Sequence, residues 1–154
     1  MKVLGVVGDS DAGKTTVIEA LLPVLADRGR VASIKSIHHP IEVDEEGKDT
    51  HRHRSAGAET VVGITPTHTF TVETTGKAAY PTDADALDAQ LATLEADGFE
   101  YVVVEGFSTA PIPKVVVGDP DRPVTDPVIK RVTPDTVDAT ALAAILEGFE
   151  SDAD

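Results

Sequence analysis

The residues with the clearest chemical signature are a glycine-rich stretch near the start of the chain. Gly8 to Thr15 runs Gly-Asp-Ser-Asp-Ala-Gly-Lys-Thr and satisfies the pattern Gly-x-x-x-x-Gly-Lys-Ser/Thr. In this pattern the glycines let backbone N–H groups curl around phosphates, the lysine reaches the β- and γ-phosphates, and the hydroxyl coordinates Mg²⁺. The helix that follows the loop adds the positive end of its dipole. The motif therefore predicts a site for a nucleotide and Mg²⁺.

We assign phosphate binding to the loop and the first helical turn, namely Gly8, Ser10, Asp11, Ala12, Gly13, Lys14, Thr15 and Thr16. Lys14 is also the predicted catalytic cation, and Thr15 a predicted metal ligand. Asp9 and Asp11 are unusual in such a loop, because two carboxylates repel phosphate unless they point outward or are offset by Mg²⁺ and salt.

A second acidic group is expected on the far side of the metal, at the end of a neighbouring buried strand. Glu105 fits this requirement, since it ends the apolar run Tyr101–Val104 and is followed by Gly106, which permits a tight turn. We predict that Glu105 is a metal ligand and a catalytic residue. The alternative is an ordinary solvated acid at a strand end.

A long polar segment from His38 to Ala58 contains most of the histidines of the chain beside lysine, arginine and aspartate. From the residues alone, three interpretations stay open: a receptor for an anionic phosphate ligand with a metal, a nickel or zinc delivery cluster, or a solvated loop. The metal-delivery interpretation would use His38, His39, His51, His53 and His68.

The elements that must position these residues follow from the apolar pattern. Lys2–Val7 is an apolar-rich run before the glycine loop, and the segment after the loop has apolar positions at helical spacing, so the order is strand, loop, helix. Further strands are expected at Val31–Ile37, Val61–Ile64, Thr69–Thr74, Tyr101–Val104 and Lys114–Val117, and helices at Asp83–Asp97 and Val137–Phe149. The pattern predicts a three-layer α/β fold of the P-loop NTPase type, with a mainly parallel central sheet and a polar or β excursion after the second strand.

Length and composition bound the class of protein. The chain has 154 residues, which fits a single nucleotide-binding domain over residues 1–150 with a frayed tail at 151–154. It has no cysteine, which excludes disulfides and thiolate metal sites, and it lacks a signal-peptide pattern, so we expect a soluble cytoplasmic protein. The net charge of −14 disfavours nucleic acid and anionic membrane as partners. The even spread of the acids suggests adaptation to high salt.

The order and spacing of several short blocks resemble the MobB family. These blocks are the loop at the N-terminus, a lysine-containing strand leading to His38-His39, Gly47-Lys48-Asp49-Thr50 with Arg52-His53-Arg54, Val103-Val104-Glu105-Gly106-Phe107 and Pro111-Ile112-Pro113-Lys114. The resemblance runs from residue 1 to about Val117. It implies an α/β P-loop protein that binds GTP with Mg²⁺, hydrolyses it feebly, forms a homodimer and assists a MobA-like guanylyltransferase in making the guanine dinucleotide form of the molybdenum cofactor.

Carried over to this chain, the resemblance implies that Asp49 is a further acidic group near the metal, with a catalytic role. It implies that Lys48, Arg52 and His39 line the approach of the anionic ligand. The family usually has a lysine where Ser108 stands here, and its final strand and loop are not recognisable in Asp126–Val132. The sequence also contains no Asn-Lys-x-Asp string to recognise guanine.

Two other functional classes remain open beside this GTP-binding adaptor. A small-molecule kinase or ATP-dependent ligase would share the P-loop, although the chain has no obvious arginine-rich lid. A metallochaperone GTPase would use the histidines for nickel or zinc. A preference for GTP over ATP would favour the adaptor.

Overall fold

The computed structural model describes residues 1–149, and its contacts divide the chain into two compact units. The first comprises Met1–Ser36 and the chain from Asp83 onward, and the second comprises Ile37–Thr82. The expectation of a single domain over residues 1–150 stays a prediction. The predicted frayed tail lies outside the described residues.

The first unit is built on a five-stranded, entirely parallel sheet in the order β2-β5-β1-β6-β7. Its strands are β1 (Lys2–Val7), β2 (Val31–Lys35), β5 (Tyr101–Glu105), β6 (Lys114–Val117) and β7 (Val128–Val132). β1 lies at the centre, where the side chains from Leu4 to Val7 are buried, as expected for a parallel strand covered on both faces. The predicted parallel sheet is confirmed.

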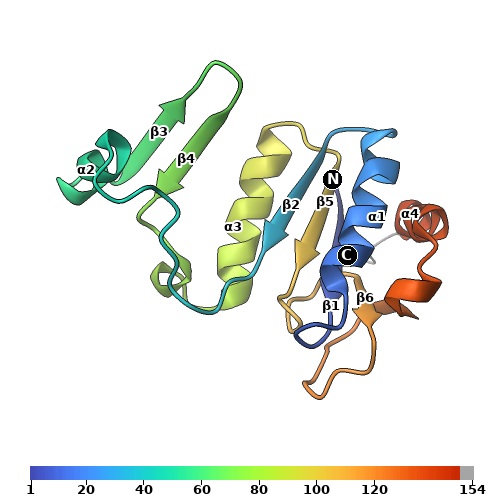
Figure 1. Cartoon of the computed structure of the whole chain (residues 1–154). Coiled ribbons are helices and arrows are strands. Elements are labelled where there is room, and N and C mark those ends of the chain that lie inside the picture. Colours follow the sequence, from blue (N-terminus) through green and yellow to red (C-terminus); the bar gives the residue numbers. More distant parts are fainter. Residues whose placement is uncertain (150–154) are drawn as a thin grey trace. The chain divides into compact units, whose positions relative to one another are not determined.

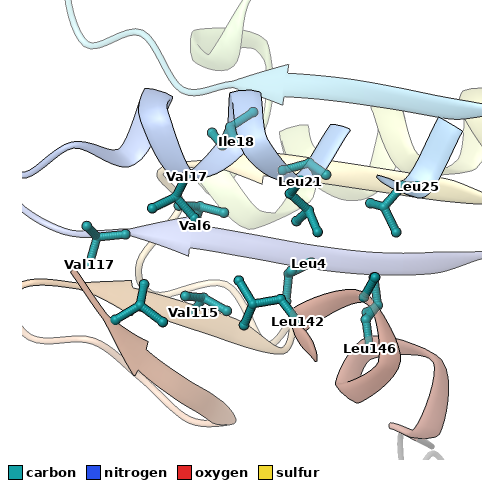
Figure 2. Close-up of a cluster of buried hydrophobic side chains, with 13 residues drawn as sticks. Leu4, Val6, Val17, Ile18, Leu21, Leu25, Val115, Val117, Leu142 and Leu146 are labelled. Atoms are coloured by element: carbon teal, nitrogen blue, oxygen red, sulfur yellow. The ribbon is translucent and has the colours of Figure 1, made fainter. Parts of the chain in front are cut away.

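Helices cover the two faces of this sheet, which gives three layers (Figure 1). One face packs against α1 (Lys14–Ala26) and α4 (Ala139–Gly148), and the other against α3 (Asp83–Ala96). Figure 2 shows the core between the sheet and the helices α1 and α4, in which Leu21 of α1 and Leu142 of α4 pack with Leu4 of β1. Val17, Leu21 and Leu25 recur every four residues on α1, so one stripe of the helix is buried while Lys14 is held at its start.

The second unit is the excursion predicted after the second strand. It contains the short helix α2 (Asp49–Ser55), a ribbon of two antiparallel strands, β3 (Thr60–Ile64) and β4 (Thr69–Glu73), and the 3₁₀ turn η1 (Lys77–Ala79). α2 packs against β3, and Val61 and Val72 are buried on one face of the ribbon. The opposite face carries Val62 and Ile64, whose exposed fractions are 52% and 80%.

Several boundaries differ from the sequence-based prediction. α2 was not predicted, and β7 occupies the stretch in which no final strand was recognised. α4 begins at Ala139, two residues later than predicted, because the Asp138 carboxylate accepts the Ala141 N–H at 2.9 Å and fixes the helix start. β2 ends at Lys35 instead of Ile37, since Ile37 already belongs to the second unit.

Candidate functional site

The glycine loop joins β1 to α1 at the carboxyl edge of the parallel sheet, where ligands of such sheets bind. Both motif glycines are required by close contacts. A Cβ on Gly8 would lie 2.4 Å from the Val117 carbonyl oxygen, and a Cβ on Gly13 would lie 2.2 Å from Cγ of Pro134. Gly13 also has φ of 89°, a left-handed conformation that side chains disfavour. The loop is therefore shaped by contacts with the last residue of β6 and with the turn after β7.

Lys14 begins α1, and its ammonium group donates a hydrogen bond to the carbonyl oxygen of Asp9 at 2.6 Å. The lysine thus spans the loop from its helical end to its strand end. Thr15 and Thr16 are exposed in the first turn of the helix, where backbone N–H groups lack intrahelical acceptors. These groups can receive phosphate oxygens, and the Thr15 hydroxyl can receive Mg²⁺.

The two unusual carboxylates of the loop have different surroundings. The Asp9 carboxylate accepts the backbone N–H of Asp121 at 3.1 Å, so it holds the segment after β6. Asp11 is exposed and has φ of 62°, a conformation that aspartate tolerates better than most residues. The charge of Asp9 is thus directed to a backbone donor of the protein, which reduces its conflict with phosphate.

Glu105 lies at the end of β5, in register with Val6 of β1, and so at the same sheet edge as the glycine loop. Its side chain is 15% exposed and its Oε1 atom lies 3.3 Å from Nζ of Lys35 at the end of β2. The next two residues turn sharply, since Gly106 has φ of 91° and Phe107 has φ of 54°. The predicted position of Glu105 is confirmed, whereas its role as a metal ligand stays a prediction.

Lys114 is a buried cation that the sequence prediction left without a role. Its side chain is 0% exposed, and its ammonium group donates to the carbonyl oxygens of Ala110, Ile112 (2.9 Å) and Thr125 (3.1 Å). Burial lowers the pKa of Lys114, and the negative charge of Asp126 opposes that shift. The ammonium group therefore joins the segment that follows Glu105 to the segment that carries Asp121.

The remaining predicted site residues belong to the second compact unit. Asp49 is the first residue of α2 and lies 3.8 Å from Arg52, while Lys48 lies 3.5 Å from Glu45. His39 is exposed in the segment before α2. A cavity of about 530 Å³ is lined by Asp49, Arg52, His53, Ser55 and Ala56. The predicted role of Asp49, Lys48, Arg52 and His39 beside the glycine loop stays a prediction.

A network of charges holds the segment before α2. The Glu42 carboxylate accepts the Asp44 N–H at 3.0 Å and pairs with Arg54 at 2.5 Å. These two contacts, the Asp44 N–H first, lower the pKa of Glu42. His51 accepts the Gly47 N–H at 3.4 Å and faces Glu42 at 3.9 Å. This histidine is thus engaged in local structure.

Residues 1–149 contain no group of three or more His, Asp or Glu side chains that could hold a metal ion, so the nickel or zinc interpretation has no assembled site in this part of the chain. No helix of this region is long and apolar enough to cross a membrane.

Sequence relatives place this geometry in a family. A family model described as molybdopterin guanine dinucleotide synthesis protein B, MobB, matches residues 3–143. The molybdopterin-guanine dinucleotide biosynthesis adapter protein of Haemophilus influenzae is 39% identical over 116 residues, which cover 75% of this chain and 62% of that protein. A putative adapter protein of the same name from Methanocaldococcus jannaschii is 36% identical over 121 residues, covering 76% of this chain and 47% of that protein. The aligned chain thus spans about half to three fifths of these curated relatives.

A solved structure agrees in fold. The crystal structure of Bacillus subtilis MobB matches with a TM-score of 0.70 and 21% identity, covering 97% of this chain and 100% of that one. Because the family match extends over most of the chain and includes the glycine loop, Glu105 and Lys114, this chain belongs to the MobB family.

Proposed function

We propose that this protein is a GTP-binding adaptor in the biosynthesis of molybdopterin guanine dinucleotide, with slow GTP hydrolysis at most. The observation that carries the proposal is the glycine loop, with Lys14 and Thr15 at the sheet edge beside Glu105, in a chain of the MobB family. The names of the relatives supply the pathway, and the loop supplies the chemistry by which a nucleotide is held.

The described residues fit a nucleotide with Mg²⁺. Gly8 and Gly13 shape the loop at positions where a Cβ would clash with Val117 and Pro134, and Lys14, which donates to the Asp9 carbonyl, would hold the β- and γ-phosphates. Thr15 and Glu105 are the oxygen donors expected around Mg²⁺, which prefers hydroxyl and carboxylate ligands. When bound, the ion neutralises charge on the phosphates.

We expect slow GTP hydrolysis because of the cation that lies beside Glu105. Lys35 already pairs with this carboxylate, so Glu105 serves better as a charged support than as a base that extracts a proton from water. We infer that binding, and not hydrolysis, is the main activity of the site.

We propose that polar side chains of the second unit contact the anionic ligand, as the family resemblance implies. Arg52 lines the open hollow beside α2, and Lys48 and His39 are exposed, so these three side chains are available to a phosphate-bearing pterin. Asp49 is the further acid that we assign to the metal. A MobA-like guanylyltransferase is the proposed protein partner.

We also propose a homodimer. Two exposed apolar side chains, Val62 and Ile64, lie on one face of the β3-β4 ribbon, and a ribbon of two strands leaves both strand edges unpaired. A second copy that packs its ribbon against this face would bury Val62 and Ile64.

The decisive experiment is titration calorimetry of the protein with GTP and with ATP, each with Mg²⁺, in low and in multimolar KCl. We expect GTP to bind more tightly than ATP, and Lys14→Ala to lose measurable binding while Lys130→Ala, a change at an exposed lysine of β7, binds as the wild type does. Preferential binding of ATP would instead support a kinase or ligase. Unchanged GTP affinity in Lys14→Ala would refute the assigned site.

A further inference from the structure

If the protein binds GTP as proposed, a residue near the glycine loop must recognise the guanine base, and the fold limits where that residue can lie. The strand order places Glu105 of β5 on one side of β1, and β6 and β7 on the other. Mg²⁺ in such sites accompanies the terminal phosphates, so with Glu105 as its ligand the phosphate end of a triphosphate would lie toward Glu105. The nucleoside end would then leave the glycine loop on the side of β6 and β7.

On that side, the turn after β7 packs directly against the glycine loop. This turn is η2 (Pro134–Thr136), which contacts α1, and the ring of Pro134 occupies the space that a side chain on Gly13 would need. The residue that follows Pro134 is therefore held next to the phosphate site, at the carboxyl end of a strand two positions from β1.

The turn is also fixed in shape. Thr133 and Thr136 form reciprocal hydrogen bonds, with the Thr133 N–H donating to the Thr136 hydroxyl at 3.2 Å and the Thr136 N–H donating to the Thr133 carbonyl at 3.1 Å. The Gly118 N–H donates to the Val132 carbonyl at 2.9 Å and ties the turn to the end of β6. A side chain on this turn has a defined origin before any ligand arrives, which lowers the entropic cost of recognition.

Asp135 is the charged side chain of this turn. It is exposed, and among residues 1–149 no hydrogen-bond donor or cation pairs with its carboxylate. We propose that Asp135 recognises guanine, by accepting the N1–H and the 2-amino group through its two carboxylate oxygens. Adenine presents an acceptor at N1 and no 2-amino group, so the same carboxylate repels it. A site built for these two donors discriminates strongly against a base that lacks them.

The chemistry of xanthine provides a test that separates recognition from general damage. Xanthine carries a carbonyl oxygen where guanine carries the 2-amino group, so an amide, which both accepts and donates, suits xanthine better than a carboxylate does. In Asp135→Asn we expect the affinity for GTP to fall by roughly 10- to 100-fold, the value of a bidentate contact to a base, while the affinity for XTP rises. Both affinities are measured by titration calorimetry with Mg²⁺.

The matched control is Asp119→Asn, which removes an exposed carboxylate that follows Gly118, a residue whose Cβ position lies 3.9 Å from Cβ of Ala12 in the glycine loop. We expect that variant to keep the preference for GTP. If Asp135→Asn binds GTP as the wild type does, or if XTP gains affinity in Asp119→Asn instead, the assignment to Asp135 is overturned while the proposed function stands. If the wild-type protein binds no GTP, the proposed function itself fails.

Discussion

Gly13 meets two separate demands, a left-handed backbone and contact with Pro134, and the two can be measured apart. In Gly13→Ala a Cβ would clash with the proline ring, and the backbone would be strained at φ of 89°. We expect a loss of unfolding free energy of about 2–4 kcal/mol and a fall in GTP affinity. Gly47 is the control, because it has φ of 81° but open space around its Cβ position.

Gly47→Ala therefore carries backbone strain alone, of about 1–2 kcal/mol. Urea unfolding of the two variants, each compared with the wild type, measures the difference. Equal losses would show that the contact between Gly13 and Pro134 contributes nothing, and the inferred link between the glycine loop and η2 would lose its support.

Lys114 shows how one buried cation can organise two segments of the site. In Lys114→Met the aliphatic part is retained, but the carbonyl oxygens of Ala110, Ile112 and Thr125 lose their donor. We expect a loss of about 2–4 kcal/mol in unfolding free energy, since buried acceptors without a partner are costly. Lys130→Met, at an exposed position of β7, should change stability by less than about 0.5 kcal/mol.

Lys114→Met should also weaken nucleotide binding. One of the two segments that Lys114 joins follows Glu105, and the other carries Asp121, whose N–H is bound by Asp9 of the glycine loop. GTP affinity should therefore fall in Lys114→Met even at temperatures where the variant is fully folded. Retained affinity in a folded Lys114→Met would limit this lysine to a role in stability.

At the scale of elements, apolar patterning predicted the central sheet and its helices, but not the elements that lack such a pattern. β1, β5 and β6 are short apolar runs, and each is buried as predicted. α2 escaped prediction because it has no buried residue, and its neighbourhood is held by pairs such as Glu42 with Arg54, which lie twelve residues apart. Charge pairing of this kind has no period along the sequence.

β7 escaped prediction for a related reason. It is an edge strand in which Lys130 and Arg131 are exposed, so its apolar residues do not form a run. The residues of the candidate site also fall into those that the sequence pattern predicted and those that it did not. The glycine loop and Glu105 follow from local patterns, whereas the partners of Lys114 and the contact of Pro134 with Gly13 exist only once distant strands are paired.

The start of α4 gives a prediction at this scale. The Asp138 carboxylate caps the helix by accepting the Ala141 N–H, and α4 covers one face of the sheet together with α1. Asp138→Ala should lower the unfolding free energy by about 1 kcal/mol, while Asp138→Asn, which can still cap, should be nearly neutral. Thermal and urea unfolding would measure both. Equal losses in the two variants would show that the capping bond does not stabilise the helix.

For the whole molecule, the exposed apolar face of the β3-β4 ribbon predicts the state of association. If two copies pair there, Ile64→Lys places a charge in the contact and should convert a dimer to a monomer in sedimentation analysis. Val43→Lys changes a similarly apolar side chain, 55% exposed but outside the ribbon, and should leave the dimer intact. A wild-type protein that sediments as a monomer at all concentrations would contradict the proposed homodimer.

The net charge of −14 acts on the molecule as a whole, because 27 acidic residues face only 13 basic ones. Their mutual repulsion is weaker in the expanded unfolded chain, so screening by salt should favour the folded state. We expect the thermal unfolding midpoint to rise by several degrees between 0.05 and 2 M KCl, a range over which the Debye screening length falls from about 13 to about 2 Å.

Screening predicts that most of the rise occurs below about 0.5 M, where the Debye length has already fallen to about 4 Å. Exclusion of salt from the protein surface would instead give a gain that continues steadily to 2 M. A midpoint that is flat or falls over the first 0.5 M would show that charge repulsion does not limit the stability of this fold.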